Sequence, residues 1–271
     1  MSENLPERIV CLTEESTELL YLLGEERRIV GISAYTVRPE RAKVEKPVVS
    51  AFISGSIAKI KALEPDLVIG FSDIQADLAR DLIKEGLNVL ILNQRSLAEI
   101  FQAMQMLGNT VGRGPDTAAL ITQWRRNLDD CRERVAARLA QRPGSRRPRV
   151  FFQEWDEPLI TGIRWVSELV EIAGGEDCFA ELQNASLAKD RITNVETVAA
   201  RRPDLIVGSW CGKAVDYEWI RRQQAWLDTP ALQLDDRLHE IDSAIILQPG
   251  PALFTDGLPA LEAIIAGVQT V

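Results

Sequence analysis

The chain alternates short apolar runs with longer segments in which apolar residues recur every three or four positions. The runs "RIVCL" (8–12), "RIVGIS" (28–33) and "NVLILN" (88–93) are too short for helices. Leu67–Ile69 is apolar on consecutive positions, which is typical of a strand buried on both faces of a parallel sheet. Between Leu67–Ile69 and "NVLILN", residues 74–85 carry apolar side chains near one helical face, and a glycine follows. This alternation predicts an α/β lobe.

The strand pattern stops between residues 96 and 142. "SLAEIFQAMQMLGNTVG" (96–112) predicts one helix, and "PDTAALITQWRRNLDDCRERVAARLAQ" (115–141) predicts another, with a proline in its first turn. The second helix would be roughly 40 Å long at about 1.5 Å per residue. A helix of that length is a stiff connection between two parts of a chain.

A second lobe follows, and it repeats a sequence motif of the first. "ALEPDLVIG" (62–70) recurs as "ARRPDLIVG" (200–208), after the strand-like "RVFFQEW" (149–155). Further strand candidates are "ALQL" (231–234) and "EIDSAIIL" (240–247). The prediction is an α/β fold of two Rossmann-like lobes joined by one long helix. The expected ranges are an N-terminal lobe at 1–112, a connecting helix at 113–143 and a C-terminal lobe at 144–271.

Composition narrows the class of protein. The 271 residues are 46% hydrophobic and 26% charged, as in soluble globular proteins, and the net charge of -9 argues against nucleic-acid binding. No apolar run approaches the roughly 18 residues of a membrane span. No signal peptide is apparent, so we expect a cytoplasmic protein, or a periplasmic one if the sequence is a trimmed piece. The four scattered cysteines suit free thiols, with two distant disulfides as the alternative.

The residues needed for most catalytic or metal chemistry are scarce. His239 is the only histidine, so no histidine cluster is available to hold zinc or manganese. No nucleophile elbow, phosphate loop or dinucleotide-binding glycine pattern occurs. We therefore expect a protein that is not an enzyme and that requires no cofactor and no metal.

Aromatic and polar residues follow several predicted strands. In open parallel sheets, ligands lie outside the carboxyl ends of the strands. Several aromatics facing one crevice would suit a large, flat ligand held by stacking and area burial. For each aromatic the alternative is ordinary core packing, and for the cysteine an inert buried thiol. The candidate ligand-binding residues at these ends are Tyr35, Phe52, Phe71, Trp155, Asp156, Trp210 and Cys211.

The order of segments along nearly the whole chain resembles a known family. The segments are "PERIVCLTEESTELLYLLGEERRIVGISAYTVRPE" (6–40), "IAKIKALEPDLVIG" (57–70), the long central helix, "LVEIAGGEDCFA" (169–180) and "VETVAARRPDLIVG" (195–208). They resemble the helical-backbone substrate-binding proteins of ATP-binding-cassette importers, in the cobalamin and iron-siderophore branch. A soluble subgroup without a signal peptide is most similar. The resemblance implies two α/β lobes, one long helix and a shallow ligand cleft between the lobes.

The resemblance also implies roles for individual positions. Tyr35 matches the family's cleft tyrosine, and Phe52 and Phe71 fall where cobalamin binders place tryptophans. Leu159 or Ile160 falls near a cleft phenylalanine of the second lobe. Where the cobalamin binder has an arginine, this chain has Gln248 near the turn "QPGP". The candidates special to the subgroup are Trp155, Trp165 and Trp210.

Docking to a transporter is the second role that the resemblance implies. Importer-bound members carry a glutamate on each lobe that pairs with arginines of the transporter. Glu196 occupies the position in the second lobe, whereas Ala58 occupies it in the first, flanked by Lys59 and Lys61. Two cations near an arginine pocket oppose docking, so we expect this partnership to be weakened.

Four hypotheses of function follow. The leading one is a solute-binding protein that holds a corrinoid by aromatic stacking, with no bond chemistry. The second is the iron-siderophore-binding component of an importer. The third is an enzyme acting on a cofactor-like heterocycle through Asp156 and Cys211, which a depressed thiol pKa would favour. The fourth is an interaction module that binds no small molecule.

Overall fold

The computed structural model describes residues 5–268, except for the side chain of Asp235. Contacts within the chain divide it into two compact units. Unit 1 comprises the residues up to Gln123 together with Pro249–Pro251, and unit 2 comprises the remainder. The division falls inside the long helix, so the ranges expected for separate lobes and a connecting helix stay predictions.

Unit 1 is built on five parallel strands in the order β3-β2-β1-β4-β5. Apolar side chains such as Val10, Val68 and Leu82 form one cluster against this sheet. The strands confirm the apolar runs read from the sequence. Their bounds are β1 Ile9–Cys11, β2 Ile29–Ser33, β3 Val48–Ser50, β4 Leu67–Phe71 and β5 Val89–Leu92.

Local signals set the ends of the helices in unit 1. Ser96 accepts a hydrogen bond from the backbone of Glu99 at 3.2 Å, and the Glu99 carboxylate accepts one from the Ser96 backbone at 2.9 Å. This capping box starts α5. The helices are α1 Glu14–Leu22, α2 Ala42–Glu45, α3 Ile57–Ala62, α4 Ala76–Lys84 and α5 Leu97–Thr110, with short 3-10 turns at Glu26–Arg28 and Asp73–Gln75.

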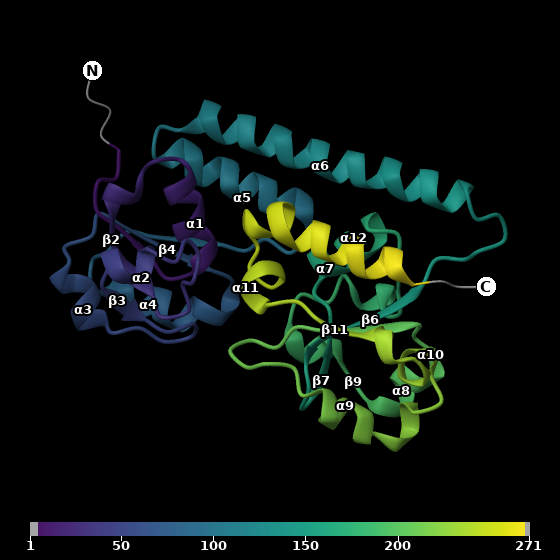
Figure 1. Cartoon of the computed structure of the whole chain (residues 1–271). Helices are drawn as coiled ribbons and strands as arrows, with labels where there is room; N and C mark the ends of the chain where they lie inside the picture. Colours follow the sequence, from purple (N-terminus) through teal and green to yellow (C-terminus); the bar gives the residue numbers. More distant parts are fainter. Residues whose placement is uncertain (1–4, 269–271) are drawn as a thin grey trace. The chain divides into compact units, whose positions relative to one another are not determined.

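The long helix α6 spans Gly114–Ala140, as the sequence predicted. In Figure 1 it runs beside α5. The two helices approach closely at Gly108, because Thr117 fills the space where a side chain at that position would begin. Among residues 5–268, no helix combines the length and apolar character that a membrane crossing needs.

Unit 2 is built on strands in the order β11-β10-β6-β7-β9, with β8 also paired to β6. Strands β6, β8, β10 and β11 run parallel, whereas β7 is antiparallel to both of its neighbours. The bounds are β6 Arg149–Trp155, β7 Leu159–Thr161, β8 Glu176–Asp177, β9 Ile192–Thr193, β10 Leu205–Gly208 and β11 Leu238–Glu240.

Two strand predictions in unit 2 were wrong. "ALQL" lies almost entirely in helix α10 (Pro230–Gln233), where Pro230 occupies the first turn. Half of "EIDSAIIL" forms helix α11 (Ser243–Ile246), because Asp242 accepts a hydrogen bond from the Ala244 backbone at 2.9 Å and starts a helix there, and only Glu240 lies in a strand, at the end of β11. The remaining helices are α7 Arg164–Ile172, α8 Val195–Ala200, α9 Tyr217–Arg222 and α12 Leu258–Gly267. A π-helical turn, Leu253–Gly257, precedes α12, and short 3-10 turns span 180–182, 188–191, 224–226 and 235–237.

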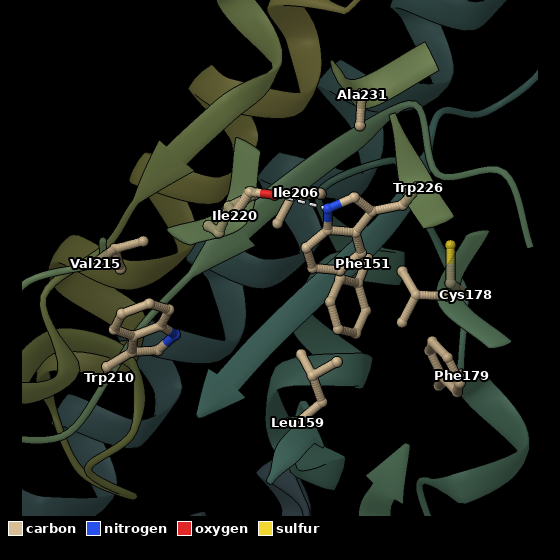
Figure 2. Close-up of a cluster of buried hydrophobic side chains, with 11 residues drawn as sticks. Phe151, Leu159, Cys178, Phe179, Ile206, Trp210, Val215, Ile220, Trp226 and Ala231 are labelled. Atoms are coloured by element: carbon tan, nitrogen blue, oxygen red, sulfur yellow. Dashed lines mark hydrogen bonds between the residues drawn. The ribbon is translucent and has the colours of Figure 1, made fainter. Parts of the chain in front are cut away.

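Aromatic side chains dominate one core cluster of unit 2 (Figure 2). Phe151 of β6 packs against Phe179 and Trp226, with ring centroids 5.6 and 6.2 Å apart. The Trp226 indole N–H donates to the Ile220 carbonyl at 2.7 Å, which satisfies its polar atom inside the cluster. This cluster supports the carboxyl-end residues of β6 and β10.

Candidate functional site

In unit 1, the carboxyl ends of three strands are tied together by one side chain. Gln75 is fully buried, and its amide N–H group donates to the carbonyls of Phe52 at 2.7 Å and Leu12 at 3.3 Å. Its amide oxygen accepts from the Phe71 backbone at 2.9 Å. These residues follow β3, follow β1 and end β4, so Gln75 fixes the edge of the sheet at which ligands of α/β proteins lie.

An aromatic pair is displayed at this edge. Tyr35 follows β2 and is 48% exposed, and its ring meets the Phe52 ring edge-on with centroids 6.2 Å apart. Phe71, by contrast, is buried, and the Arg95 guanidinium lies 5.0 Å from its ring centroid. Tyr35 and Phe52, rather than Phe71, therefore present the aromatic surface of unit 1.

Two carboxylic acids that the sequence reading passed over lie at the carboxyl end of β1. Glu14 and Glu15 begin α1 and are only 2% and 6% exposed. The pKa of Glu14 is raised to about 8, mainly by burial and also by the charges of Glu18 and Glu15, while nearby backbone amides lower it. Burial likewise raises the pKa of Glu15 to about 7, while the Thr13 hydroxyl, which donates to it at 2.6 Å, lowers it. This edge therefore carries less negative charge at neutral pH than its sequence implies.

In unit 2, adjacent parallel strands bring Trp155 and Trp210 together. Trp155 ends β6, and Trp210 follows the end of β10 by two residues. The Lys213 ammonium lies between the two rings, 4.3 Å from the Trp155 centroid and 4.8 Å from the Trp210 centroid. It donates to both oxygens of Asp156 at 2.7 Å. Three of the predicted site residues therefore surround one lysine that the sequence reading did not single out.

Two of the three tryptophans predicted to face a ligand are buried in the structure. Trp165 on α7 is almost fully buried, and its indole N–H donates to the Ile246 carbonyl at 2.9 Å. Its expected place among ligand-facing residues is thus corrected to core packing, because the apolar face of α7 turns it inward. Trp210 is also buried (Figure 2), and its ring meets that of Trp219 edge-on, with ring centroids 6.2 Å apart. Trp155 is the partly exposed member of the three.

The carboxylates and the thiol considered for catalysis are held in ion pairs or have a raised pKa. Asp156 is paired with Lys213, and Glu154 is paired with the buried Arg191 at 2.6 Å. Desolvation raises the pKa of the Cys211 thiol to about 11, and the Glu154 charge adds to this effect, although the residue as a whole is exposed. A raised thiol pKa disfavours a thiolate nucleophile at neutral pH. Within the described residues, no group of three His, Cys, Asp or Glu side chains is placed to hold a metal ion.

The remaining predicted positions lie apart from these clusters. Glu196 is exposed in the first turn of α8, which Asn194 caps at 2.8 Å. Ala58 is exposed on α3, and Lys61 beside it pairs with Glu85 at 2.5 Å. Gln248 is partly buried after α11. Leu159 belongs to the unit 2 core, and Ile160 is partly buried on β7.

Comparison with known proteins decides the family. The sequence profile described as periplasmic binding protein matches residues 9–240, which is most of the chain. The chain belongs to this family of periplasmic binding proteins. The family match confirms the resemblance read from the sequence, including the fold class of two α/β domains. It makes this protein a solute-binding protein.

Relatives and solved structures agree with that membership. A vitamin B12-binding protein of Yersinia pestis (strain Pestoides F) is 28% identical over 213 residues, covering 78% of this chain and 72% of its own. An uncharacterized ABC transporter substrate-binding lipoprotein of Bacillus subtilis, YvrC, is 23% identical over 92% of this chain and 76% of its own. A periplasmic heme binding protein from Pseudomonas aeruginosa superposes with a TM-score of 0.82 at 21% identity, over 98% of this chain and 95% of its own. These relatives are binding proteins rather than enzymes.

Proposed function

We propose that this periplasmic binding protein is the corrinoid-binding component of an ATP-binding-cassette importer. The observation that carries the proposal is the aromatic pair Tyr35–Phe52, displayed at the carboxyl edge of the unit 1 sheet. The B12-binding relative in Yersinia pestis supports the choice of ligand class. The heme-binding structure shares the fold and makes heme the ligand to test against it.

The physical basis is stacking on a surface that is already in place. Aromatic side chains bury large areas at little entropic cost, which suits a wide macrocycle. Gln75 holds the backbone that carries Phe52 by a 2.7 Å hydrogen bond, so this wall needs little reorganisation on binding. A preorganised surface retains more of its contact energy as affinity.

The proposal requires no bond chemistry and no resident cofactor. The ion pair of Asp156 and the raised thiol pKa of Cys211 fit a residue set that binds without reacting. For the transporter partner, we propose docking through Glu196, weakened at Ala58 because Lys59 is exposed beside it. Exposed charges contribute modestly, so the weakening should be partial.

The experiment is calorimetric titration of the protein with hydroxocobalamin and cyanocobalamin. We expect about one equivalent to bind, with a Kd tighter than about 10 μM, equivalent to about 7 kcal/mol or more. Replacing Tyr35 and Phe52 together by alanine should weaken binding about 10-fold or more, since each ring contributes roughly 1 kcal/mol or more. Ile53→Ala, which truncates an exposed apolar side chain next to Phe52, is the matched control. Saturable binding of hemin or a ferric siderophore but of neither cobalamin would overturn the ligand assignment.

A further inference from the structure

Trp155, Trp210, Asp156 and Lys213 form an arrangement that we call the lysine-filled cage. Two indole faces and one carboxylate surround a single ammonium group, at 4.3 and 4.8 Å from the ring centroids and 2.7 Å from the carboxylate oxygens. Cations placed over indole faces are attracted by the ring quadrupole, and aromatic cages of this kind recognise alkylated ammonium groups. Here the cation is supplied by the protein itself.

The walls of the cage are held independently of the lysine. The Trp155 indole N–H donates to the Glu157 carbonyl at 3.0 Å. Trp210 is packed edge-on against Trp219, which in turn packs against Trp226 of the unit 2 core. Both tryptophans also stand at the carboxyl ends of adjacent parallel strands, the position at which α/β proteins bind ligands. Removing the lysine should therefore leave an aromatic cage of the same shape.

The lysine, in contrast, lies on a short exposed loop between the buried Trp210 and the buried Val215. Residues 209–216 form neither helix nor strand, and residues 211–214 are exposed. Gly212 has a φ of +77°, and the Lys213 backbone N–H reaches the Trp210 carbonyl only at 3.5 Å. The Lys213 side chain is 41% exposed, so its ammonium group can return to water, whereas the Asp156 side chain is only 14% exposed and needs a cation beside it.

We propose that Trp155, Trp210 and Asp156 form a binding site for the ammonium group of an organic cation, and that Lys213 occupies it until such a ligand displaces it. The chemistry selects a cation, because an anion would face the Asp156 carboxylate once the lysine has left. A neutral planar ligand would leave that carboxylate without a partner beside the rings. This site goes beyond corrinoid binding, which we assign to Tyr35 and Phe52.

The test uses choline as a probe and 3,3-dimethylbutan-1-ol as its neutral isostere, at constant ionic strength. Tryptophan fluorescence and calorimetry should show saturable binding of choline to the wild-type protein, with a Kd on the order of 1 mM for so small a ligand. The isostere should not bind. Lys213→Ala should bind choline about 10-fold tighter, because its own cation no longer competes. Lys189→Ala, an exposed lysine of the same unit, should match the wild type.

Variants of the walls complete the experiment. Asp156→Asn and Trp155→Ala should each weaken choline binding about 10-fold, because the carboxylate and the indole face both hold the cation. Thermal midpoints of all variants show whether the fold is retained, and Trp155→Phe, which keeps a ring, should weaken binding less than Trp155→Ala. Equal binding of choline and its isostere overturns the proposal. Binding to Lys213→Ala alone also overturns it, because Lys213 would then be a fixed part of the structure. Cobalamin titrations of the same proteins report on the corrinoid proposal separately.

Discussion

Gln75 shows how one side chain determines the geometry of a ligand edge. Its amide makes three hydrogen bonds to backbone groups, at the end of β4 and just after β1 and β3. Buried backbone groups without partners are expensive, so this amide is required for the three chain segments to meet. The partly buried ring of Phe52 depends on it for its position.

Replacing Gln75 by alanine should lower the free energy of unfolding by about 2–4 kcal/mol, because three buried backbone groups lose their partner. Urea denaturation followed by circular dichroism measures the change. Gln102→Ala removes an exposed amide on α5 and should have little effect. An unchanged stability for Gln75→Ala would show that water or another group satisfies this edge.

Glu14 and Glu15 should make stability depend on pH in an unusual direction. Their pKa values are raised from 4.5 to about 8 and about 7 by burial, so the folded chain binds more protons than the unfolded chain between about pH 4.5 and 8. Unfolding therefore releases protons in this window, and its free energy falls as the pH rises. Glu14→Gln should be more stable than wild type by about 4 kcal/mol at pH 8, and by about 1 kcal/mol at pH 5.5.

Urea denaturation of the two proteins at both pH values gives the comparison. Asp77→Asn, which replaces an exposed carboxylate of the same unit, serves as the control and should follow the wild type. A Glu14→Gln variant with the same pH dependence as wild type would mean that the Glu14 carboxylate ionises in the folded protein as it does in the unfolded chain.

The sequence placed some residues of the candidate site at strand ends and gave no sign of others. Tyr35 and Phe52 stand at strand ends in the structure, because strand position follows from the apolar pattern. Trp165 was misplaced, because the face of a short helix that turns inward is set by tertiary packing. Gln75 and Lys213 carried no local signal, since their partners come from other strand ends or from another loop.

Some helices and strands could be predicted from the sequence more easily than others. Buried parallel strands and α6 were predictable, because their apolar runs and length leave few alternatives. Helices α10 and α11 were predicted as strands, because an apolar run of four residues fits either structure. A proline in the first turn and a capping aspartate decided these two cases.

Capping should matter measurably for α5. Ser96→Ala removes the side-chain acceptor of the Glu99 backbone N–H, so the free energy of unfolding should fall by about 1 kcal/mol. Thr122→Ala, an exposed hydroxyl inside α6, is the control and should cause no loss. Thermal and urea unfolding measure both. Equal stabilities of Ser96→Ala and wild type would mean that packing alone fixes the start of α5.

At the scale of the whole molecule, the fold and the ligand are separate questions. A heme-binding structure shares the fold at 21% identity, and a vitamin B12-binding protein is a sequence relative. The family therefore establishes a solute-binding protein, and the side chains at the strand ends decide what is bound. In this chain those side chains are an aromatic pair in unit 1, of which Tyr35 is exposed and Phe52 partly buried, and a lysine-filled cage in unit 2.

The most direct test of corrinoid binding is calorimetric titration of the wild-type protein with hydroxocobalamin. Saturable binding of about one equivalent, with a Kd tighter than about 10 μM, is the result we predict. Absence of binding of both hydroxocobalamin and cyanocobalamin at concentrations about 10-fold higher would contradict it. That outcome would leave a solute-binding protein of this family with a different ligand.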